Sequence, residues 1–342
     1  MGLNLKPLIT SKTITISELN GKIVAADAFN IIYQFLATIR GPTGEPLTDN
    51  QGQPTSHLSG LFYRNISLMC EGIKLIYIFD GPPNELKIKE IERRKKIKLE
   101  TTEKYNLALI EGRLDDAKKY SQGTSILTSK IIEESKNILS FMGIPFIDAL
   151  SDGESTAAYL SRKEIVHACV SQDYDSILFG AKRLIRNLTI SGKRKIPNRN
   201  MYINVEPELI EYEETLKKNN LTQEQLIDLG ILIGTDFNIN GFNGIGPKTA
   251  LKLIQKYKKL ENIEKIKDEL LDTPYDEIRK IFLEPNVTPV ENIDIQFKDL
   301  NKEKIINFLC DEKNFSYERV NNSIEKLNKT IFKKSQSLDK WF

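Results

Sequence analysis

The chain alternates between short apolar runs and longer segments in which apolar residues recur at helical spacing. Residues 22–27 (KIVAAD) form an apolar run typical of a buried strand, and residues 28–40 carry apolar positions at the spacing of an amphipathic helix. The alternation continues, with helices predicted from residues 55 and 129 and strands at 75–81, 144–148 and 165–172. This pattern indicates an α/β fold with a mainly parallel central sheet flanked by helices.

Beyond residue 220 the pattern changes to helices alone. Thr222 and Gln225 have the spacing of a capping box, which predicts the start of a helix over TQEQLIDLGILIG. A glycine-rich turn, GFNGIGPKTA at 241–250, separates it from a second amphipathic segment. Neither a repeat nor a low-complexity linker interrupts the chain before a polar segment at 331–342, which ends in two aromatic residues.

Acidic residues follow the apolar runs throughout the chain. The set is Asp27, Asp80, Asp152, Glu154, Asp173, Asp175 and Asp236. Because ligands of open parallel sheets bind beyond the carboxyl ends of the strands, we expect these acids to converge there. Packed carboxylates repel one another unless cations compensate their charge. Mg²⁺ prefers oxygen ligands, and pairs of such ions cleave phosphodiesters in many nucleases.

Each acid taken alone has a simpler interpretation, because acids after strands are common as helix caps and turn residues. Ser151 is a plausible N-cap with Glu154 at the matching capping-box position, and Asp236 could merely end a helix. The set as a whole exceeds what capping requires. It therefore favours a metal-dependent site built from oxygen ligands.

The remaining composition excludes other classes. Three widely spaced cysteines and two histidines argue against a zinc site and for a reducing, intracellular compartment. No apolar stretch approaches the roughly 20 residues that span a bilayer, and the N-terminus is too short and polar for a signal peptide. The net charge is only +2, but residues 176–205 contain seven cations and no acid. This stretch fits a phosphate backbone and a solvated hairpin face equally well.

The turn at 241–250 is a candidate for binding duplex nucleic acid. Gly244 and Gly246 allow a tight turn and a close approach to a ligand, and Pro247 suits the first turn of the next helix. Backbone N–H groups at such a helix start can hold a phosphate, and Lys248 and Lys252 add charge. The pattern is that of a helix-hairpin-helix element; the alternative is an ordinary glycine turn.

Residues 85–104 form a charged, helix-prone run with eight Lys or Arg and five Glu. Lys87 and Arg94 are two helical turns apart, so they share one face near the end of the Asp80 strand. A positive helix beside a metal site could guide single-stranded nucleic acid, although such runs are most often solvated helices. Tyr33, six residues after Asp27, is as consistent with a core position as with a base-stacking platform.

In these motifs the chain resembles the archaeal flap endonucleases of the structure-specific 5′-nuclease family. The resemblance rests on the initial MG and on VAADAFNIIYQFL, TSHLSGLFYR, YIFDGPP, SQDYDSILFG, RNLTISGKRK, LIDLGILIGTDFN, GIGPK and FLEPNVT. These segments cover nearly the whole chain in order. The resemblance implies a PIN-like 5′-nuclease fold and two Mg²⁺ ions. The implied ligands of the first ion are Asp27, Asp80, Asp152 and Glu154. Those of the second are Asp173, Asp175 and Asp236, with Glu154 a candidate shared ligand.

The resemblance also implies how the chain is divided. A single nuclease domain would cover 1–330, with a helical arch at 84–135 and a helix-hairpin-helix region at 222–260 that often holds K⁺ in this family. A flexible tail at 331–342 would bind the sliding clamp PCNA. The implied catalytic residues of the arch are Lys87 and Arg94. The implied DNA-binding residues are Tyr33, Arg64, Gly244, Gly246, Lys248 and Lys252, and the implied clamp-binding residues are Leu338, Trp341 and Phe342.

Two positions depart from the family pattern. Asp152 stands where the family usually has Glu, so its ligation could run through water. Ser335 replaces the usual Gln of the clamp-binding box, which affects clamp affinity more than clamp binding itself.

The expected function is therefore Mg²⁺-dependent cleavage of 5′ flap DNA in replication and repair, with an accompanying 5′–3′ exonuclease activity. The chain is expected to act as a monomer away from membranes, in the cytoplasm if it is archaeal. The alternatives are a DNA-binding scaffold that has lost catalysis and a resolvase-like or mainly exonucleolytic relative.

Overall fold

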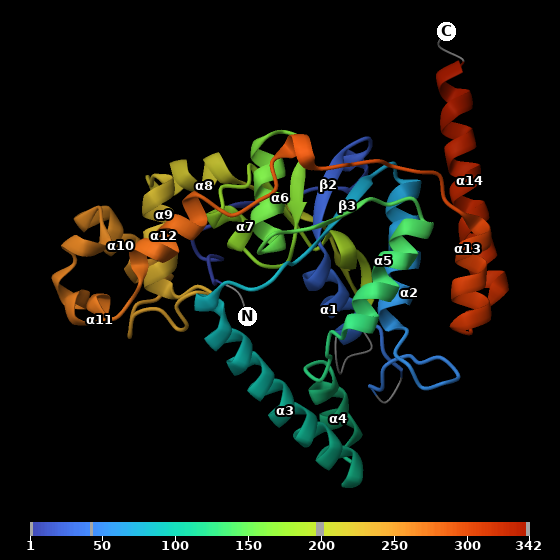
Figure 1. The fold of residues 1–342 in the computed structure, drawn as a ribbon, viewed down its shortest axis with the longest axis horizontal. Helices are drawn as coiled ribbons and strands as arrows, with labels where there is room; N and C mark the ends of the chain where they lie inside the picture. Colours follow the sequence, from blue (N-terminus) through green and yellow to red (C-terminus); the bar gives the residue numbers. More distant parts are fainter. Residues whose placement is uncertain (1–2, 42–43, 196–201, 340–342) are drawn as a thin grey trace.

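A seven-stranded sheet forms the centre of the molecule (Figure 1). The computed structural model describes residues 3–41, 44–195 and 202–339. The strands lie in the order β1-β9-β6-β5-β2-β3-β4. Their bounds are β1 Ser11–Thr13, β2 Ile23–Asp27, β3 Lys74–Phe79, β4 Phe146–Asp148, β5 Ala168–Val170, β6 Arg183–Arg186 and β9 Glu208–Glu211. A separate hairpin pairs β7 (Gly192–Lys195) with β8 (Tyr202–Val205).

The part of the sheet that carries the acids is parallel, as predicted. Strands β6, β5, β2, β3 and β4 run parallel, whereas β9 is antiparallel to both β6 and β1. In the β2–β3 register Asp27 is opposite Ile78. The ends of these two strands, and the acids that follow them, therefore reach the same edge of the sheet.

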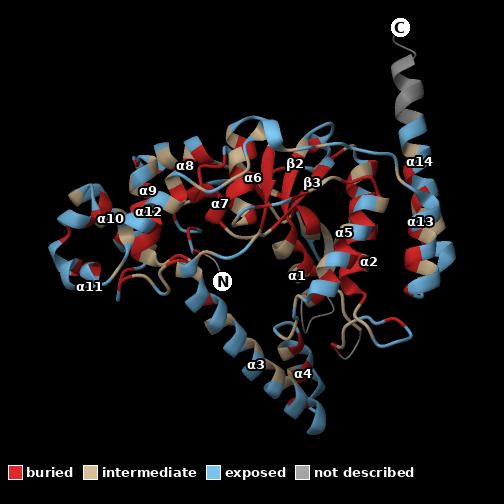
Figure 2. Ribbon diagram, viewed as in Figure 1, coloured by how far each residue is buried: buried red, intermediate tan, exposed pale blue. Residues whose placement is uncertain are grey.

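Both faces of the sheet are covered, and the strand residues alternate between two cores. Val24 and Ala26 of β2 belong to the core beneath α1 (Ala28–Thr38), α2 (Ser56–Cys70) and α5 (Ser129–Phe141). Ala25 belongs to the opposite core, beneath α6 (Gly153–Arg162), α7 (Asp175–Leu178) and α9 (Gln223–Ile233). Burial on both faces explains why these strands are continuous apolar runs (Figure 2).

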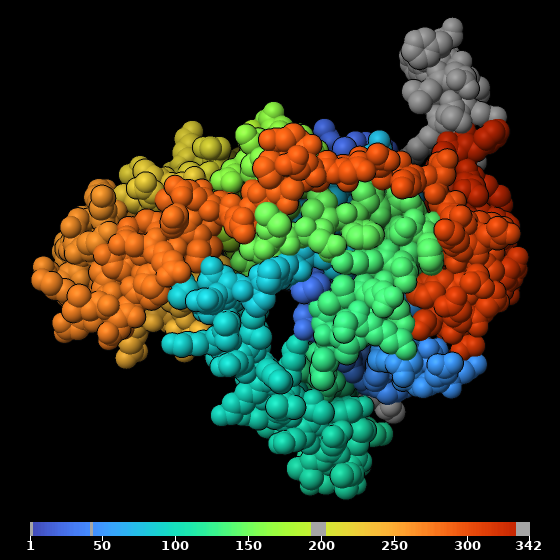
Figure 3. Space-filling model, in the orientation of Figure 1, coloured from blue at the N-terminus to red at the C-terminus, as the bar shows by residue number. Residues whose placement is uncertain are grey.

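A helical arch projects from the body. It consists of η2 (Glu85–Lys87), the long helix α3 (Ile88–Ile110) and the returning helix α4 (Leu114–Ser121), and together with the body it borders an open space (Figure 3). The two helices pack through small residues, since Ala108 and Ala117 are buried. The sequence predicts an arch region that extends to residue 135. That residue lies inside α5, whose apolar face packs against α2 in the body.

The C-terminal segment is more helical than predicted. Helix α13 (Lys302–Ile306) leads through a π-helical turn (Asn307–Glu312) into α14 (Tyr317–Asp339). Helix α14 crosses the expected boundary at residue 331. Val320, Ile324 and Leu327 recur at helical spacing and are buried, so they pack the first half of α14 against the core that α2 covers. The side chains of Leu338, Trp341 and Phe342 lie outside the part of the chain that the structure describes. Within the described ranges, no helix is both long enough and apolar enough to cross a membrane.

Candidate active site

The first two acids stand at the ends of adjacent strands. Asp27 is the last residue of β2 and the N-cap of α1, where its Oδ1 accepts a hydrogen bond from the main-chain N–H of Asn30 at 3.0 Å. Asp80 directly follows β3, and its Oδ1 accepts from the N–H of Gly153 at 2.6 Å. That bond joins Asp80 to the start of α6, which carries the next two acids.

Asp152 and Glu154 lie at the beginning of α6, but the capping prediction is wrong. The N-cap of α6 is Asp152 rather than Ser151. The Ser151 hydroxyl donates instead to the carbonyl of Asn286 at 3.1 Å. Glu154 accepts a hydrogen bond from Ser171 Oγ at 3.0 Å, so its carboxylate points toward the end of β5 rather than back to the helix start.

The remaining acids come from two further elements. Asp173 follows β5 and accepts a hydrogen bond from Asn30 Nδ2 at 2.9 Å, while Asp175 opens α7. Asp236 follows a helix, α9, rather than a strand. Gly234 ends that helix at φ +109°, and a Cβ there would lie 2.5 Å from the main-chain nitrogen of Gly241. This close approach requires glycine and fixes the loop that carries Asp236.

Two cations from the base of the arch, Lys87 and Arg94, lie among these acids. Lys87 Nζ forms an ion pair with Asp152 and lies 3.4 Å from Asp236 Oδ2. The guanidinium of Arg94 binds the other oxygen of Asp236, and its Nε binds Glu90 Oε1 at 2.6 Å. Although burial alone would lower it, the pKa of Lys87 is raised because Asp152 and Asp236 surround the ammonium.

The electrostatics of the cluster are those of crowded carboxylates, of which Asp27 and Asp175 are buried and the other five partly buried. Burial and the charge of Asp80 raise the pKa of Asp27 to about 8. Burial and the charge of Asp236 raise the pKa of Asp175 to about 7. Burial together with Asp175 raises the pKa of Glu154 well above its ordinary value. The two arch cations therefore leave most of the negative charge of the cluster uncompensated.

The donor set fits a hard divalent cation. All seven acids supply carboxylate oxygens, and Asp175 Oδ1 is buried with no hydrogen-bond partner. Among the described residues, however, no three acid, histidine or cysteine side chains are gathered closely enough to hold one ion together. Lys87 and Arg94 draw Asp152 and Asp236 toward themselves. Binding of a cation by those two acids would therefore require these ion pairs to open.

Tyr33 lies where the arch meets the body. It is partly buried on α1, and Lys98 of α3 reaches across to it. Lys98 Nζ donates to the Tyr33 hydroxyl at 2.9 Å and stands 4.1 Å from the ring centroid. Sequence reasoning missed Lys98, whose only signal was its place in the charged run.

Arg64 of α2 is engaged with the protein itself. Its guanidinium donates to the carbonyl of Leu188 and to the hydroxyl of Ser191, so it holds the turn after β6. The basic stretch is also partly neutralised, since Lys182, Arg183 and Arg186 form ion pairs with Glu164, Glu211 and Glu208.

The predicted helix-hairpin-helix consists of α9 and α10 (Pro247–Tyr257). Thr222 caps α9 in the predicted capping box, and Gly246 is the N-cap of α10, with Pro247 at its first position. Gly244 has φ +72°, and both it and Gly246 are exposed with open space around them. Lys248 and Lys252 are exposed on α10.

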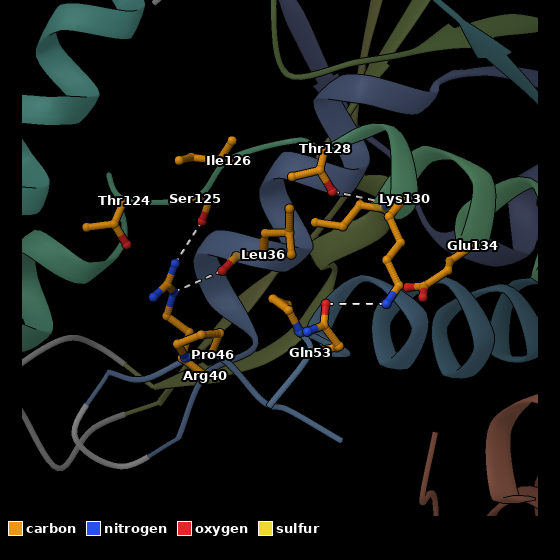
Figure 4. Close-up of a pocket in the computed structure, with 12 residues that line it drawn as sticks. Leu36, Arg40, Pro46, Gln53, Thr124, Ser125, Ile126, Thr128, Lys130 and Glu134 are labelled. Carbon is orange, nitrogen blue, oxygen red and sulfur yellow. Dashed lines mark hydrogen bonds between the residues drawn. The ribbon is translucent and has the colours of Figure 1, made fainter. Parts of the chain in front are cut away.

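A cavity of 290 Å³ lies between the end of α1 and the segment that returns from the arch, and none of the seven acids lines it (Figure 4). Arg40 spans it by donating to the carbonyls of Leu36 and Gly44 and to Ser125 Oγ. Structural hydrogen bonds therefore cross this cavity, and it lies apart from the acid cluster.

Comparison with known proteins places the acids within two matched segments. The XPG N-terminal domain matches residues 2–101, and the XPG I-region matches residues 143–236. Flap endonuclease 1 of Nitrosopumilus maritimus is 52% identical over 342 residues, which is 100% of both chains. The structure of flap endonuclease-1 from Methanococcus jannaschii is 40% identical, has a TM-score of 0.74, and covers 97% of this chain and 100% of its own. The catalytic core of Rad2 in complex with DNA substrate shares the fold, with a TM-score of 0.71 at 22% identity, over 96% of this chain and 100% of its own.

Proposed function

The chain belongs to the flap endonuclease family and is a structure-specific flap nuclease, and from this premise we propose that it cuts 5′ flaps of DNA at the junction with duplex by Mg²⁺-dependent hydrolysis. The observation that carries the proposal is a partly buried cluster of acids with too few cations, at the foot of an arch with open space beneath it. The products would be a 5′ phosphate and a 3′ hydroxyl.

The acids would hold two Mg²⁺ ions. Asp27, Asp80, Asp152 and Glu154 would serve one, and Asp173, Asp175 and Asp236 the other, with Glu154 shared between them. When bound, the ions supply charge stabilisation to the attacking and leaving oxygens of an in-line displacement. Asp152 is one methylene shorter than the usual Glu of the family, so a water molecule would bridge its carboxylate and the ion.

Lys87 and Arg94 would exchange their partners when the substrate binds. In the free enzyme both are paired with acids of the cluster. A scissile phosphate that enters the site would compete for these two cations and free Asp152 and Asp236 for Mg²⁺. At the phosphate, both cations would stabilise the negative charge that grows in the transition state.

The substrate would be positioned on both sides of the cut. Tyr33 would stack on the base beside the scissile phosphate, once Lys98 leaves its ring for the flap backbone. Arg64 would act through the turn at 188–191 that it holds. The exposed start of α10, with Gly244, Gly246, Lys248 and Lys252, would hold the duplex backbone without reading bases, with K⁺ as a bound ion.

The remaining assignments are proposed from the sequence. A clamp-binding segment with Leu338, Trp341 and Phe342 would dock on PCNA during replication and repair. The nuclease would act as an intracellular monomer, with 5′–3′ exonuclease activity as a side reaction. Deletion of residues 335–342 would leave cutting of free flap DNA unchanged and abolish stimulation by loaded clamp.

A cleavage assay tests the proposal directly. A 5′-labelled double-flap DNA is incubated with the enzyme and Mg²⁺, and the cut is mapped to the nucleotide. We expect one cut at the junction and none in EDTA, while the same duplex without a flap remains intact or is trimmed slowly. Tight binding without cutting would favour a scaffold that has lost catalysis. Trimming of the duplex end in preference to the flap would favour a mainly exonucleolytic enzyme.

A further inference from the structure

Asn30 connects two parts of the acid cluster that come from different strands. It lies in the first turn of α1, three residues after Asp27, and its main-chain N–H donates to Asp27 Oδ1 at 3.0 Å. Its side-chain Nδ2 donates to Asp173 Oδ2 at 2.9 Å. Its Oδ1 accepts from the main-chain N–H of Gln172 at 3.2 Å. One residue therefore contacts the end of β2 and the loop that follows β5.

The chemistry of the partners fixes the orientation of the Asn30 amide. An ionised carboxylate can only accept a hydrogen bond, and a peptide N–H can only donate one. Nδ2 must therefore face Asp173, and Oδ1 must face Gln172. Both ends of the amide are used, so an apolar side chain of the same volume could not replace either contact.

Ser171 completes the support of the same loop. Its hydroxyl donates to Glu154 Oε1 at 3.0 Å and accepts from the main-chain N–H of Asp173 at 3.2 Å. The loop 171–173 is thus held by Asn30 on the α1 side and joined to Glu154 on the α6 side.

An uncharged donor is well suited to this position. Asp27 and Asp173 repel each other, and this repulsion contributes to the raised pKa of Asp27. A lysine here would neutralise a carboxylate and compete with a bound cation. An amide orients Asp173 and leaves its charge and its other oxygen available. Hydrogen-bond partners of this kind behind metal-binding carboxylates commonly change metal affinity or activity by about tenfold to hundredfold.

We propose that Asn30 is a positioning residue that holds the Asp173 carboxylate in place relative to Asp27 for binding of a divalent cation. The inference rests on the proposed function, because it takes Asp27 and Asp173 as ligands. Asn30 itself would contact neither the ion nor the DNA.

The test uses two substitutions and one matched control in the full chain. Asn30→Ala removes the amide, and Asn30→Leu removes it while keeping the volume and a good helix propensity. Gln34→Ala is the control. Gln34 is a partly buried amide one turn further along α1, and it accepts a hydrogen bond from Thr189 rather than contacting the acids. Thermal unfolding in EDTA shows that each variant is folded.

Two readouts follow. Calorimetric titration of the DNA-free enzyme with MgCl₂ should show binding weakened by about tenfold to hundredfold in both Asn30 variants and unchanged in Gln34→Ala. In single-turnover cleavage, the Mg²⁺ concentration for half-maximal rate should rise by a similar factor. The rate at saturating Mg²⁺ should return to near the wild-type value, because Asn30 acts only through Asp173.

Unchanged Mg²⁺ affinity in both folded Asn30 variants would overturn the inference. A lowered saturating rate with an unchanged Mg²⁺ requirement would overturn it as well, since Asn30 would then act on the reacting groups. If the wild type failed to cut flaps, the proposed function would fall. The calorimetric difference between Asn30→Ala and Gln34→Ala would still decide the role of Asn30.

Discussion

Two buried groups of charged residues in this molecule have opposite electrostatic characters. In the first, burial and neighbouring acids raise the pKa of Asp27 and of Glu154, and in the part of the chain that the structure describes the cations paired with the cluster are Lys87 and Arg94. In the second, Glu134 of α5 is fully paired. Lys313 Nζ lies 2.5 Å from its Oε1, and His57 Nε2 lies 3.1 Å from its Oε2. Burial would raise the pKa of Glu134, but these partners lower it.

The comparison shows how partners decide the role of a buried carboxylate. Glu134 and Glu154 are both glutamates on helices that flank the sheet. Glu134 of α5 is bound by His57 of α2 and by Lys313, which directly follows the π-helical turn. The negative charge of Glu134 therefore joins α5 to α2 and to the C-terminal segment, and it stabilises the packing of the body. Around Glu154 the nearest charges are further acids, so the site stores repulsion that a bound cation would relieve.

The largest effect is expected when one uncompensated acid is neutralised. Asp175→Asn should lower the single-turnover cleavage rate on the order of a thousandfold, the scale of several kcal/mol lost with a metal ligand. Asp173→Ala should do the same. The stability of metal-free Asp175→Asn in EDTA should not fall, because Asp175 Oδ1 has no partner to lose. Rate and melting temperature are measured on the same preparations, and flap DNA binding should remain largely intact.

A variant that cuts at nearly the wild-type rate would remove Asp175 from the proposed ligands. A variant that loses stability in EDTA would show that its charge is compensated after all, and the contrast with Glu134 would fail.

In the group around Glu134, removal of one charge is expected to lower the stability of the protein. Lys313→Met should destabilise the protein by about 3 kcal/mol, because it leaves Glu134 buried with less compensation. The double variant Glu134→Gln/Lys313→Met should recover part of that loss, because Glu134 no longer carries a charge. The recovery should be incomplete, because Asp49 also pairs with Lys313 at 3.7 Å and loses that cation. Denaturant unfolding of the four proteins of this cycle gives the coupling energy. A loss in the double variant equal to the sum of the two single losses would mean that the pair contributes nothing.

The sequence predicted the first group far better than the second. Asp27, Asp80 and Asp173 lie at or just beyond the ends of parallel strands, so their arrangement at one edge of the sheet follows from the sheet. Asp236 follows a helix, α9, and its position does not. Glu134 lies in an ordinary amphipathic helix, SKIIEESKNIL, and its partner Lys313 is 179 residues away. No local pattern connects residues so far apart, because their contact depends on how α5 packs against the C-terminal helices.

Other details of the active site were also not predicted, because they too depend on how distant elements pack. Glu154 does not take the capping role that its spacing predicts, because a capping-box spacing does not reveal that Ser171 donates a hydrogen bond to its carboxylate. The ion pairs of Lys87 and Arg94 with Asp236 follow from the direction in which the arch leaves the body, which no periodicity determines. Asn30 had one signal, its position three residues after Asp27 in the first helical turn.

The arch offers a matched pair that tests the compensating cations. Arg93 and Arg94 both bind Glu90, but only Arg94 also binds Asp236. Arg94→Ala should slow single-turnover cleavage roughly thirtyfold if the charge of Arg94 acts on the reacting phosphate. This factor corresponds to about 2 kcal/mol of activation free energy. Lys87→Ala should act in the same direction, and Arg93→Ala should have little effect. A change in DNA affinity alone, with the single-turnover rate preserved, would make the arch cations only an electrostatic guide.

The smallest expected effect is a dependence of stability on pH. In the unfolded chain these aspartates are ionised above about pH 4, whereas in the folded, metal-free protein burial and neighbouring acids raise the pKa of Asp175 to about 7 and that of Asp27 to about 8. From about pH 6 to about pH 8 the folded state therefore binds more protons than the unfolded state, and its stability in EDTA should fall as the pH rises.

Mg²⁺ binds the ionised carboxylates, so the rise in melting temperature that it produces should be larger at the higher pH. Glu134, with its lowered pKa, stays ionised throughout and adds no such slope. Calorimetric melts at both pH values, with and without Mg²⁺, measure the effect, and Asp175→Asn should reduce it. An equal Mg²⁺ effect at both pH values would mean that the acids are already compensated in the free enzyme.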